Sequence, residues 1–388
     1  MAASPRFEEV IFIENRADNH GGAFYVASGR PVLRNCVFRG NTSGIQGGAV
    51  CFFYSESDPR IENCVFEGNR ATIIGGGVAF DGSGTPSMTG CVLRGNTAES
   101  GGGASVTFGT ARIENCSFEE NTASLGGALA MDCAEAAKLI DCEIHDNVAA
   151  LEGGGIRAIA SAFALEDCRV VENRCDGMGG AGLLRDTNGT LLGCSVLRNE
   201  ATEWAGGLFV MGGRLSAVEG EFVGNGLAVS AFETQMDIDA RNSYWGHASG
   251  PYHPTANPGG LGDEVGDHVL FAPWAATSAV DDRDPAIAPP ATRRALAAIP
   301  NPSAAGQPVR IVLRDAGGDR SAPAGVRAVL FDVAGRRIRS LDAADRSGSL
   351  DDAAGFVWDG RDAHGRVCPP GVYIIGYAGG SVPLVKLP

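Results

Sequence analysis

Six acidic residues lie on predicted strands, where carboxylates could bind a cation or act as acid and base. They are Asp81, Asp132, Asp186, Glu62, Glu114 and Glu166. A lyase needs clustered acids that bind calcium and a nearby arginine or lysine as base, whereas a hydrolase needs two carboxylates across a groove. The aspartates lie at different offsets within the repeat described below, and Thr89 and Ile140 interrupt the glutamate series. We interpret both sets as solvated faces and predict no catalytic and no cofactor-binding residue.

A second group of potential ligands lies between residues 241 and 274. It comprises His247, His253, His268, Asp263 and Asp267. Imidazole and carboxylate groups are common metal ligands, but polar loop residues are the simpler interpretation. The calcium-binding nonapeptide pattern, which needs an aspartate after Gly-x-Gly-x, is also absent from the sequence. We therefore predict no metal site.

The strands that carry these residues belong to a repeat of about 26 residues. Its clearest feature is a column of asparagines at steps of 25 to 28 residues. The column is Asn15, Asn41, Asn69, Asn96, Asn121, Asn147, Asn173, Asn199 and Asn225. A fixed period in this range indicates a stacked architecture in which each repeat contacts its neighbours.

Two further columns precede the asparagines. Five residues earlier the chain places Cys36, Cys64, Cys91, Cys116, Cys142, Cys168 and Cys194. The column three residues before each asparagine is apolar throughout, as at Phe38 and Phe66. Positions two apart on a strand share a face, so both columns are predicted to face the interior. Stacked cysteines would be too far apart for relaxed disulfides, and we interpret them as small buried residues; strained bridges and metal binding are the alternatives.

Paired glycines such as Gly21-Gly22 and Gly47-Gly48 follow each asparagine and mark a tight corner. Each repeat then holds about three short strands and three turns, with no segment periodic enough for a helix. The predicted fold is all-β: a right-handed parallel β-helix of about nine coils, followed by a small immunoglobulin-like β-sandwich. Asparagines stacked at one corner can bond to each other and to the backbone, which offsets the cost of burying an amide.

The change of pattern along the chain predicts four regions. The β-helix covers residues 1–240, and a C-terminal cap rich in aromatic residues, proline and glycine covers residues 241–276. A linker rich in Ala, Pro, Asp and Arg follows at residues 277–295. Residues 296–388 alternate as sandwich strands do, and their length suits an immunoglobulin-like domain for sorting or anchoring.

Charge and composition exclude some classes of protein. The formal net charge of −15 argues against a nucleic-acid partner, which needs basic patches. No run of 18 apolar residues occurs, so no transmembrane segment is predicted. No secretory signal is visible, and the repeat begins at Phe7. Because an open first coil would expose strand edges, we expect that an N-terminal stretch is missing.

The strand after the glycines is apolar on both faces, which predicts an external contact face. The residues assigned to its outer face are Phe24, Phe52, Leu129, Met131, Ile159, Leu184, Phe209 and Met211. A contiguous apolar patch of this kind usually marks a binding site. The alternatives are that another segment covers it, or that the assigned register is wrong by one residue.

The repeat resembles that of the polymorphic outer-membrane proteins, within the pectate-lyase-like β-helix superfamily. The resemblance rests on Phe-x-x-Asn, as in Phe38-Arg39-Gly40-Asn41, and Gly-Gly-Ala-apolar, as in Gly47-Gly48-Ala49-Val50, which recur in phase over residues 7–230. It implies a surface-exposed or secreted protein, because the better-known members are adhesins. The C-terminal membrane barrel of that family is absent from this sequence, so the export route must differ.

The last region resembles the C-terminal sorting domains of type IX secretion cargo and the immunoglobulin-like domain of flagellar hook-capping proteins. The matching motifs are Pro300-Asn301-Pro302, Phe331-Asp332-Val333-Ala334-Gly335-Arg336, Trp358-Asp359-Gly360 and Pro370-Gly371-Val372-Tyr373. The resemblance implies export across an outer membrane, with the domain contacting the export machinery, followed by retention at the surface or release.

The sequence thus predicts a non-catalytic protein at the extracellular or outer-membrane surface. Its expected partner is an extracellular glycan or protein surface, bound in adhesion or recognition. A polysaccharide lyase or glycoside hydrolase of the same superfamily is one alternative. A structural surface-layer component is the other.

Overall fold

The computed structural model describes residues 4–53, 58–82, 84–232, 237–278, 294–299, 309–315, 327–332, 337–342, 355–362, 365–369, 371–377 and 380–386. The chain divides into two compact units, Met1–Val280 and Asp281–Pro388. All regular elements of the described residues are β-strands. Accordingly, this part of the chain contains no helix of the length and hydropathy needed to cross a membrane.

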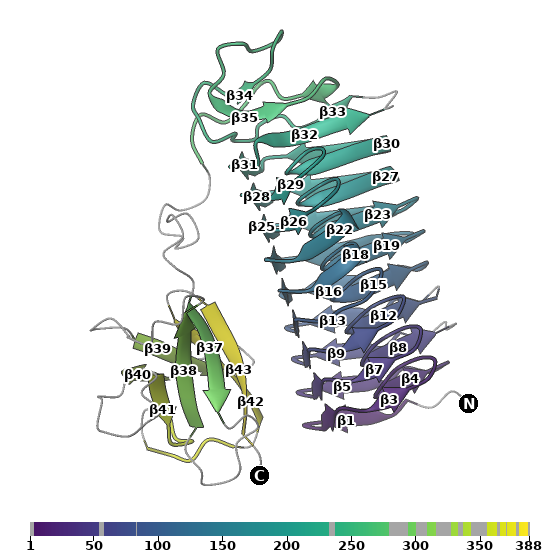
Figure 1. The fold of residues 1–388 in the computed structure, drawn as a ribbon, viewed down its shortest axis with the longest axis vertical. Coiled ribbons are helices and arrows are strands. Elements are labelled where there is room, and N and C mark those ends of the chain that lie inside the picture. The colour runs from purple at the N-terminus through teal and green to yellow at the C-terminus, as the bar shows by residue number, and fades with distance from the viewer. Residues whose placement is uncertain are drawn as a thin grey trace. The chain divides into compact units, whose positions relative to one another are not determined.

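The first unit is a parallel β-helix whose coils stack one above the next (Figure 1). One sheet takes a single strand from each coil, and its nine strands define nine coils. These strands are β2 (Ile11–Ile13), β6 (Val37–Arg39), β10 (Val65–Glu67), β14 (Val92–Arg94), β17 (Ser117–Glu119), β21 (Glu143–His145), β25 (Arg169–Val171), β28 (Ser195–Leu197) and β31 (Glu221–Val223).

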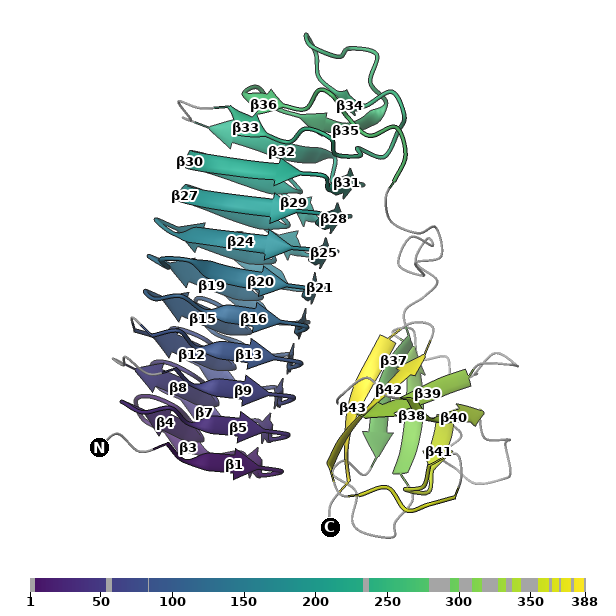
Figure 2. The ribbon, with the colours of Figure 1, turned by 180° about the vertical axis from the view of Figure 1, so that it is seen from behind.

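A larger sheet of 20 strands takes two segments from most coils. The segments that follow the glycine corner are β4 (Phe24–Val26), β8 (Val50–Phe53), β12 (Val78–Asp81), β15 (Ala104–Thr107), β19 (Leu129–Asp132), β23 (Ile156–Ile159) and β32 (Leu227–Phe232). The segments that precede the cysteine column are β1 (Arg6–Glu8), β5 (Val32–Arg34), β9 (Arg60–Glu62), β13 (Ser87–Thr89), β16 (Arg112–Glu114), β20 (Ala137–Ile140), β24 (Ala162–Glu166) and β33 (Ile238–Asp239). In two coils both segments join into one long strand, β27 (Gly182–Leu192) and β30 (Leu208–Val218), as Figure 2 shows.

Short strands at the remaining corner form two small sheets. They are β3 (Arg16–Ala17), β7 (Thr42–Ser43) and β11 (Arg70–Ala71), then β18 (Thr122–Leu125), β22 (Val148–Glu152), β26 (Arg174–Cys175) and β29 (Glu200–Ala201). The cap adds β34 (Pro251–Tyr252), β35 (Gly262–Val265) and β36 (Val269–Leu270) to the large sheet. Trp245 of this segment stacks on Phe222 of the last coil, with ring centroids 4.9 Å apart, and so continues the buried aromatic column.

The asparagine column forms a ladder of buried amides. The Oδ1 atom of Asn96 accepts hydrogen bonds from the backbone N–H and the Nδ2 atom of Asn69, at 2.9 and 3.0 Å. The Nδ2 atom of Asn69 also donates to the carbonyl oxygen of Phe38 at 2.9 Å, and its Oδ1 atom accepts two bonds from Asn41. Each such amide uses both donors and both acceptor sites, which removes the penalty for burying it.

Every asparagine-to-asparagine step of the ladder has the same direction: the backbone N–H and Nδ2 of one asparagine donate to Oδ1 of the asparagine in the next coil toward the C-terminus. Asn15 begins it as an exposed residue that donates to Asn41. Asp263 of the cap ends it, accepting bonds from the backbone N–H and Nδ2 of Asn225 at 2.7 and 3.2 Å and from the N–H of Gly224 at 3.0 Å. A carboxylate suits this position because aligned donors converge on it.

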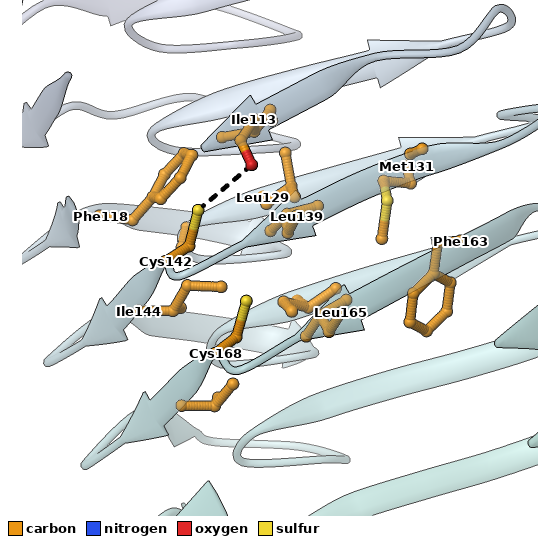
Figure 3. Packing of buried hydrophobic residues seen from close by; sticks show 14 of the residues in the cluster. Ile113, Phe118, Leu129, Met131, Leu139, Cys142, Ile144, Phe163, Leu165 and Cys168 are labelled. Carbon is orange, nitrogen blue, oxygen red and sulfur yellow. Dashed lines mark hydrogen bonds between the residues drawn. The ribbon is translucent and has the colours of Figure 1, made fainter. Parts of the chain in front are cut away.

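The cysteine column lies in the same core. The Sγ atom of Cys142 contacts the carbonyl oxygen of Ile113 at 3.5 Å, and Cys168 lies one coil further along beside Leu165 (Figure 3). All 11 cysteines are free, and all except Cys133 are buried. Burial raises the pKa of the Cys64, Cys91 and Cys116 thiols well above the ordinary range, so these buried thiols are unreactive small apolar residues.

The glycine corner explains an error in the sequence-based register. Phe24, Phe52, Leu129, Met131 and Leu184 were predicted to face outward, yet their side chains belong to the central core or pack against it. Because strand side chains alternate, an error of one residue exchanges the two faces. The large side chains are needed inside to fill the coil. Of the predicted contact face, the outward-facing residues are Ile159, Phe209 and Met211.

Two constraints fix that corner. The glycine at its first position has positive φ, as at Gly47 (62°), where a side chain would be strained. At Gly48, a Cβ atom would lie 2.1 Å from the carbonyl oxygen of Gly76 in the next coil, so the close approach of coils excludes any side chain. In several coils a third glycine follows, as at Gly77, which makes the start of the strand hard to recognise from the sequence.

The second unit contains two antiparallel sheets. One consists of β37 (Arg294–Ile299), β38 (Val309–Asp315) and β41 (Gly355–Trp358); the other consists of β40 (Arg337–Asp342), β39 (Arg327–Asp332), β42 (Gly371–Tyr377) and β43 (Gly380–Lys386). Trp358 is fully buried, and its Nε1–H donates to the carbonyl oxygen of Arg361 at 2.9 Å. The linker predicted for residues 277–295 lies largely outside the described residues.

Replacing a central asparagine of the ladder should be costly. Asn121→Ala removes the acceptor of two bonds from Asn96 and the donor to Leu93 and Asn147. We expect the free energy of urea-induced unfolding to fall by about 3–5 kcal/mol, because buried polar groups lose their partners. The control is Asn188→Ala on the exposed side of β27, which should cost less than about 0.5 kcal/mol. Equal losses in both variants would contradict a special role for the ladder.

Thiol labelling should distinguish the buried cysteines from the exposed one. In the native protein we expect one rapidly reacting thiol, Cys133, and in denaturant all 11. The Cys133→Ser variant should therefore show almost no native labelling. Rapid native reaction of several thiols would contradict the buried column.

Candidate functional site

The outer face of the strands that follow the glycine corner carries the most varied side chains of the β-helix. We call it the outer strip, and it consists of three columns that run from coil to coil. The corner column is His20, Gln46, Ile74, Ser100, Leu125, Glu152 and Met178, followed by Trp204. The middle column is Tyr25, Cys51, Ala79, Ser105, Ala130, Arg157, Leu183 and Phe209. The third column is Phe53, Asp81, Thr107, Asp132, Ile159, Arg185, Met211 and Phe232.

An ion-pair cluster occupies the centre of the outer strip. Arg157 contacts Asp132 at 2.6 Å through Nη1 and Glu152 at 2.9 Å through Nε. Arg185, one coil further, contacts the other oxygen of Glu152 at 2.7 Å. Two guanidinium and two carboxylate groups thus neutralise one another across neighbouring coils. We name these four residues the central cluster.

The central cluster keeps the Glu152 carboxylate ionised. Burial alone would raise the pKa of Glu152, but hydrogen bonds and charge from Arg157 and Arg185 more than offset it, and the net pKa is lowered. A carboxylate of lowered pKa is a poor proton donor near neutrality, and a guanidinium does not act as a base at its ordinary pKa. The cluster is therefore better suited to presenting hydrogen-bond donors and acceptors than to acid–base chemistry.

The structure corrects the offsets assigned to the strand aspartates. Asp81 and Asp132 lie in one column, both paired with Thr107 between them. The corner before β12 begins at Gly75, the first of three glycines, and counting from the later pair shifts Asp81 by one position. Asp81 accepts a hydrogen bond from Gln46 at 3.1 Å, and burial raises the pKa of its carboxyl group. Asp186 lies outside this column, at an exposed position of positive φ within β27.

Aromatic side chains flank the central cluster on both sides. Toward the N-terminal coils, the ring of His20 stacks on Phe53 at 4.9 Å and on Tyr25 at 5.7 Å. Toward the C-terminal coils, Trp204 stacks on Phe209 at 5.2 Å and lies 6.1 Å from Phe232. Tyr25, Trp204 and Phe232 are among the large apolar side chains that remain exposed.

The C-terminal aromatic group rests on a small apolar cluster outside the main core. It contains Leu183, Ala205 and Phe209, with Ile159, Met178, Met211 and Leu227 packed against them. Phe209 is only 2% exposed although it faces outward, because Trp204 covers it. Of the residues predicted for an apolar contact face, Ile159, Phe209 and Met211 belong to this cluster.

The remaining acidic candidates are paired elsewhere. Glu62, Glu114 and Glu166 share one column, with Thr89 and Ile140 between them. Their partners are Arg34, Arg112 and Lys138, respectively. They line the outer face of the other strand series and do not meet the central cluster.

The histidines and aspartates of the cap do not converge. His253 is 3.3 Å from Asp267, His268 is 3.5 Å from Asp237, and Asp263 is engaged by the asparagine ladder. Among the described residues, no group of three or more His, Cys, Asp or Glu side chains is placed to hold a metal ion.

Comparison with known families identifies the fold. The family model described as the right-handed beta helix region matches residues 4–123 and 76–243, together more than half of the chain. The chain belongs to this family. No curated protein and no solved structure matches the chain. Membership of the β-helix family makes the nine coils right-handed and fits a surface-exposed or secreted protein.

Sequence reasoning did not find Glu152, Arg157, Arg185 or Trp204. Glu152 and Trp204 each precede a glycine corner, whereas Arg157 and Arg185 interrupt apolar strands. A charged residue within an apolar strand, five residues after an acid across the corner, was the available signal. This signal can be recognised only when the strand register is known.

Glu152→Gln should reveal the central cluster through its pH dependence. The folded pKa of Glu152 lies below its unfolded value, so the ionised carboxylate stabilises the protein above about pH 4.3. That contribution is lost as the pH falls through the folded pKa. We expect the variant to unfold more easily than wild type at pH 7 and the difference to shrink below about pH 4. The control Glu200→Gln, at an exposed position, should show little difference, and a Glu152→Gln effect independent of pH would contradict this account.

Proposed function

We propose that this chain is an exported, non-catalytic β-helix protein that binds extracellular glycans or surfaces along the outer strip. The observation that carries the proposal is the central cluster, with exposed aromatic rings of the outer strip toward both its N-terminal and its C-terminal coils. The hydroxyl groups of carbohydrates hydrogen-bond to planar carboxylate and guanidinium groups. The apolar faces of sugar rings pack against aromatic rings. The outer strip supplies both kinds of partner on one side of the β-helix.

The β-helix supports this role by fixing side chains before a ligand arrives. The residues of the middle and third columns lie on strands that are paired on both sides in the interior coils. The central cluster also ties neighbouring coils together through side chains. Binding to such a surface loses little conformational entropy, which is the advantage of a pre-organised site.

The second unit serves in this proposal as the sorting or anchoring domain. Its two antiparallel sheets and the buried Trp358 fit a small immunoglobulin-like sandwich. The motifs that resemble type IX cargo domains support export across an outer membrane, with the export machinery as partner. The protein would then act at the extracellular or outer-membrane surface.

A polysaccharide lyase is the second candidate. It is favoured by the direct contact of Asp132 with Arg157 on the outer strip, since acids beside an arginine are the groups that such an enzyme needs. The lowered pKa of Glu152 and the occupation of both acids by guanidinium groups favour binding instead.

Incubation with a panel of neutral and acidic polysaccharides, with and without calcium, tests the proposal. We expect retention of at least one polymer by the native protein and no new oligosaccharides by mass spectrometry, with urea-unfolded protein as the control. Released products, especially unsaturated ones, would establish an enzyme. Neither retention nor release for any polymer would contradict glycan binding and favour a protein partner or a structural surface-layer role.

A further inference from the structure

We infer that the C-terminal end of the outer strip is a subsite for a neutral hexose or pentose unit of a polysaccharide, with Trp204 as the stacking platform and Arg185 and Glu152 as hydrogen-bonding partners. The inference rests on the proposed function and names both a position and a ligand class.

Trp204 has the geometry of a fixed platform. One face of its indole lies on Phe209, with 22° between the ring planes, while the side chain as a whole remains 46% exposed. Phe232, which is 42% exposed, stands beside it at an angle of 53°. Two exposed aromatic rings at an angle form a corner that can hold one sugar ring by its apolar face.

Polar partners border the platform. Arg185 Nη2 lies 3.9 Å from the Sδ atom of Met211, which itself packs against the apolar cluster under Trp204. The same nitrogen donates to Glu152 at 2.7 Å. Glu152, Arg185 and Trp204 come from three successive coils at strand spacings of about 4.8 Å. A sugar chain lying along the β-helix would therefore meet the ion pair and then the aromatic rings.

The charges favour a neutral sugar over an acidic one. Both arginines of the central cluster are already neutralised by two carboxylates, so neither is available as an uncompensated anion site. The chain as a whole carries a net charge of −15, which repels polyanions. The hydroxyl groups of a neutral sugar do not need a site of net charge, because they donate to carboxylates and accept from guanidinium groups.

The test is calorimetric titration of the full-length protein with cellohexaose, xylohexaose, mannohexaose and laminarihexaose, and with hexagalacturonate as the acidic probe. We expect at least one neutral hexasaccharide to bind, with an affinity that changes less than twofold between 50 and 500 mM NaCl. Trp204→Ala should weaken this binding by at least tenfold, and Trp204→Phe should restore part of it.

Tyr252→Ala is the matched control, because Tyr252 is a similarly exposed aromatic residue in the cap, outside the outer strip. It should change the affinity less than twofold, and circular dichroism should show both alanine variants folded. Neutral-sugar binding that is unaffected by Trp204→Ala, or equally reduced by Tyr252→Ala, would overturn the subsite while leaving glycan binding intact. Binding of hexagalacturonate alone would overturn the ligand class. Binding of no sugar here, together with no polymer retention, would overturn the proposed function as well.

Discussion

Complete hydrogen bonding of a stacked amide is the constraint on which the rest of this structure depends. An asparagine buried in an apolar core is costly unless both donors and both acceptor sites find partners. In each interior coil those partners come from the coil before and the coil after. The ladder therefore fixes coil spacing and register together. The direction of the ladder also explains its two ends. Asn15 begins the ladder as an exposed residue, and the carboxylate of Asp263 accepts the bonds that the last asparagine donates.

The same stacking produces the candidate site. A position in the repeat becomes a column on the surface, so side chains 25 to 28 residues apart in the chain become neighbours. The contacts of Arg157 with Asp132 and of Arg185 with Glu152 are bonds of this kind between coils. The apolar group under Trp204 forms in the same way from the last four coils. Scaffold and candidate site are thus two outcomes of one repeat.

Much of the fold could be predicted because its signals repeat in phase. Columns of asparagine, cysteine and phenylalanine each recur often enough to reveal the period and the buried face. The outer strip was harder to predict, since its residue types differ from coil to coil. There the prediction depended on strand register, and glycine runs of two or three residues obscured where each strand begins, which is why Phe52 and Leu129 were assigned to the wrong face.

By itself the sequence determined that this chain is a stack of nine β-coils with an asparagine corner and a cysteine column, because these depend on periodicity alone. Only the tertiary structure decided which strand face is outside, that Asp263 completes the ladder from 38 residues away, and that Glu152 and Arg185 meet. The physical reason is that alternation on a strand has a period of two. A one-residue ambiguity at a glycine corner leaves the fold unchanged but exchanges the interior for the surface, and function lies on the surface.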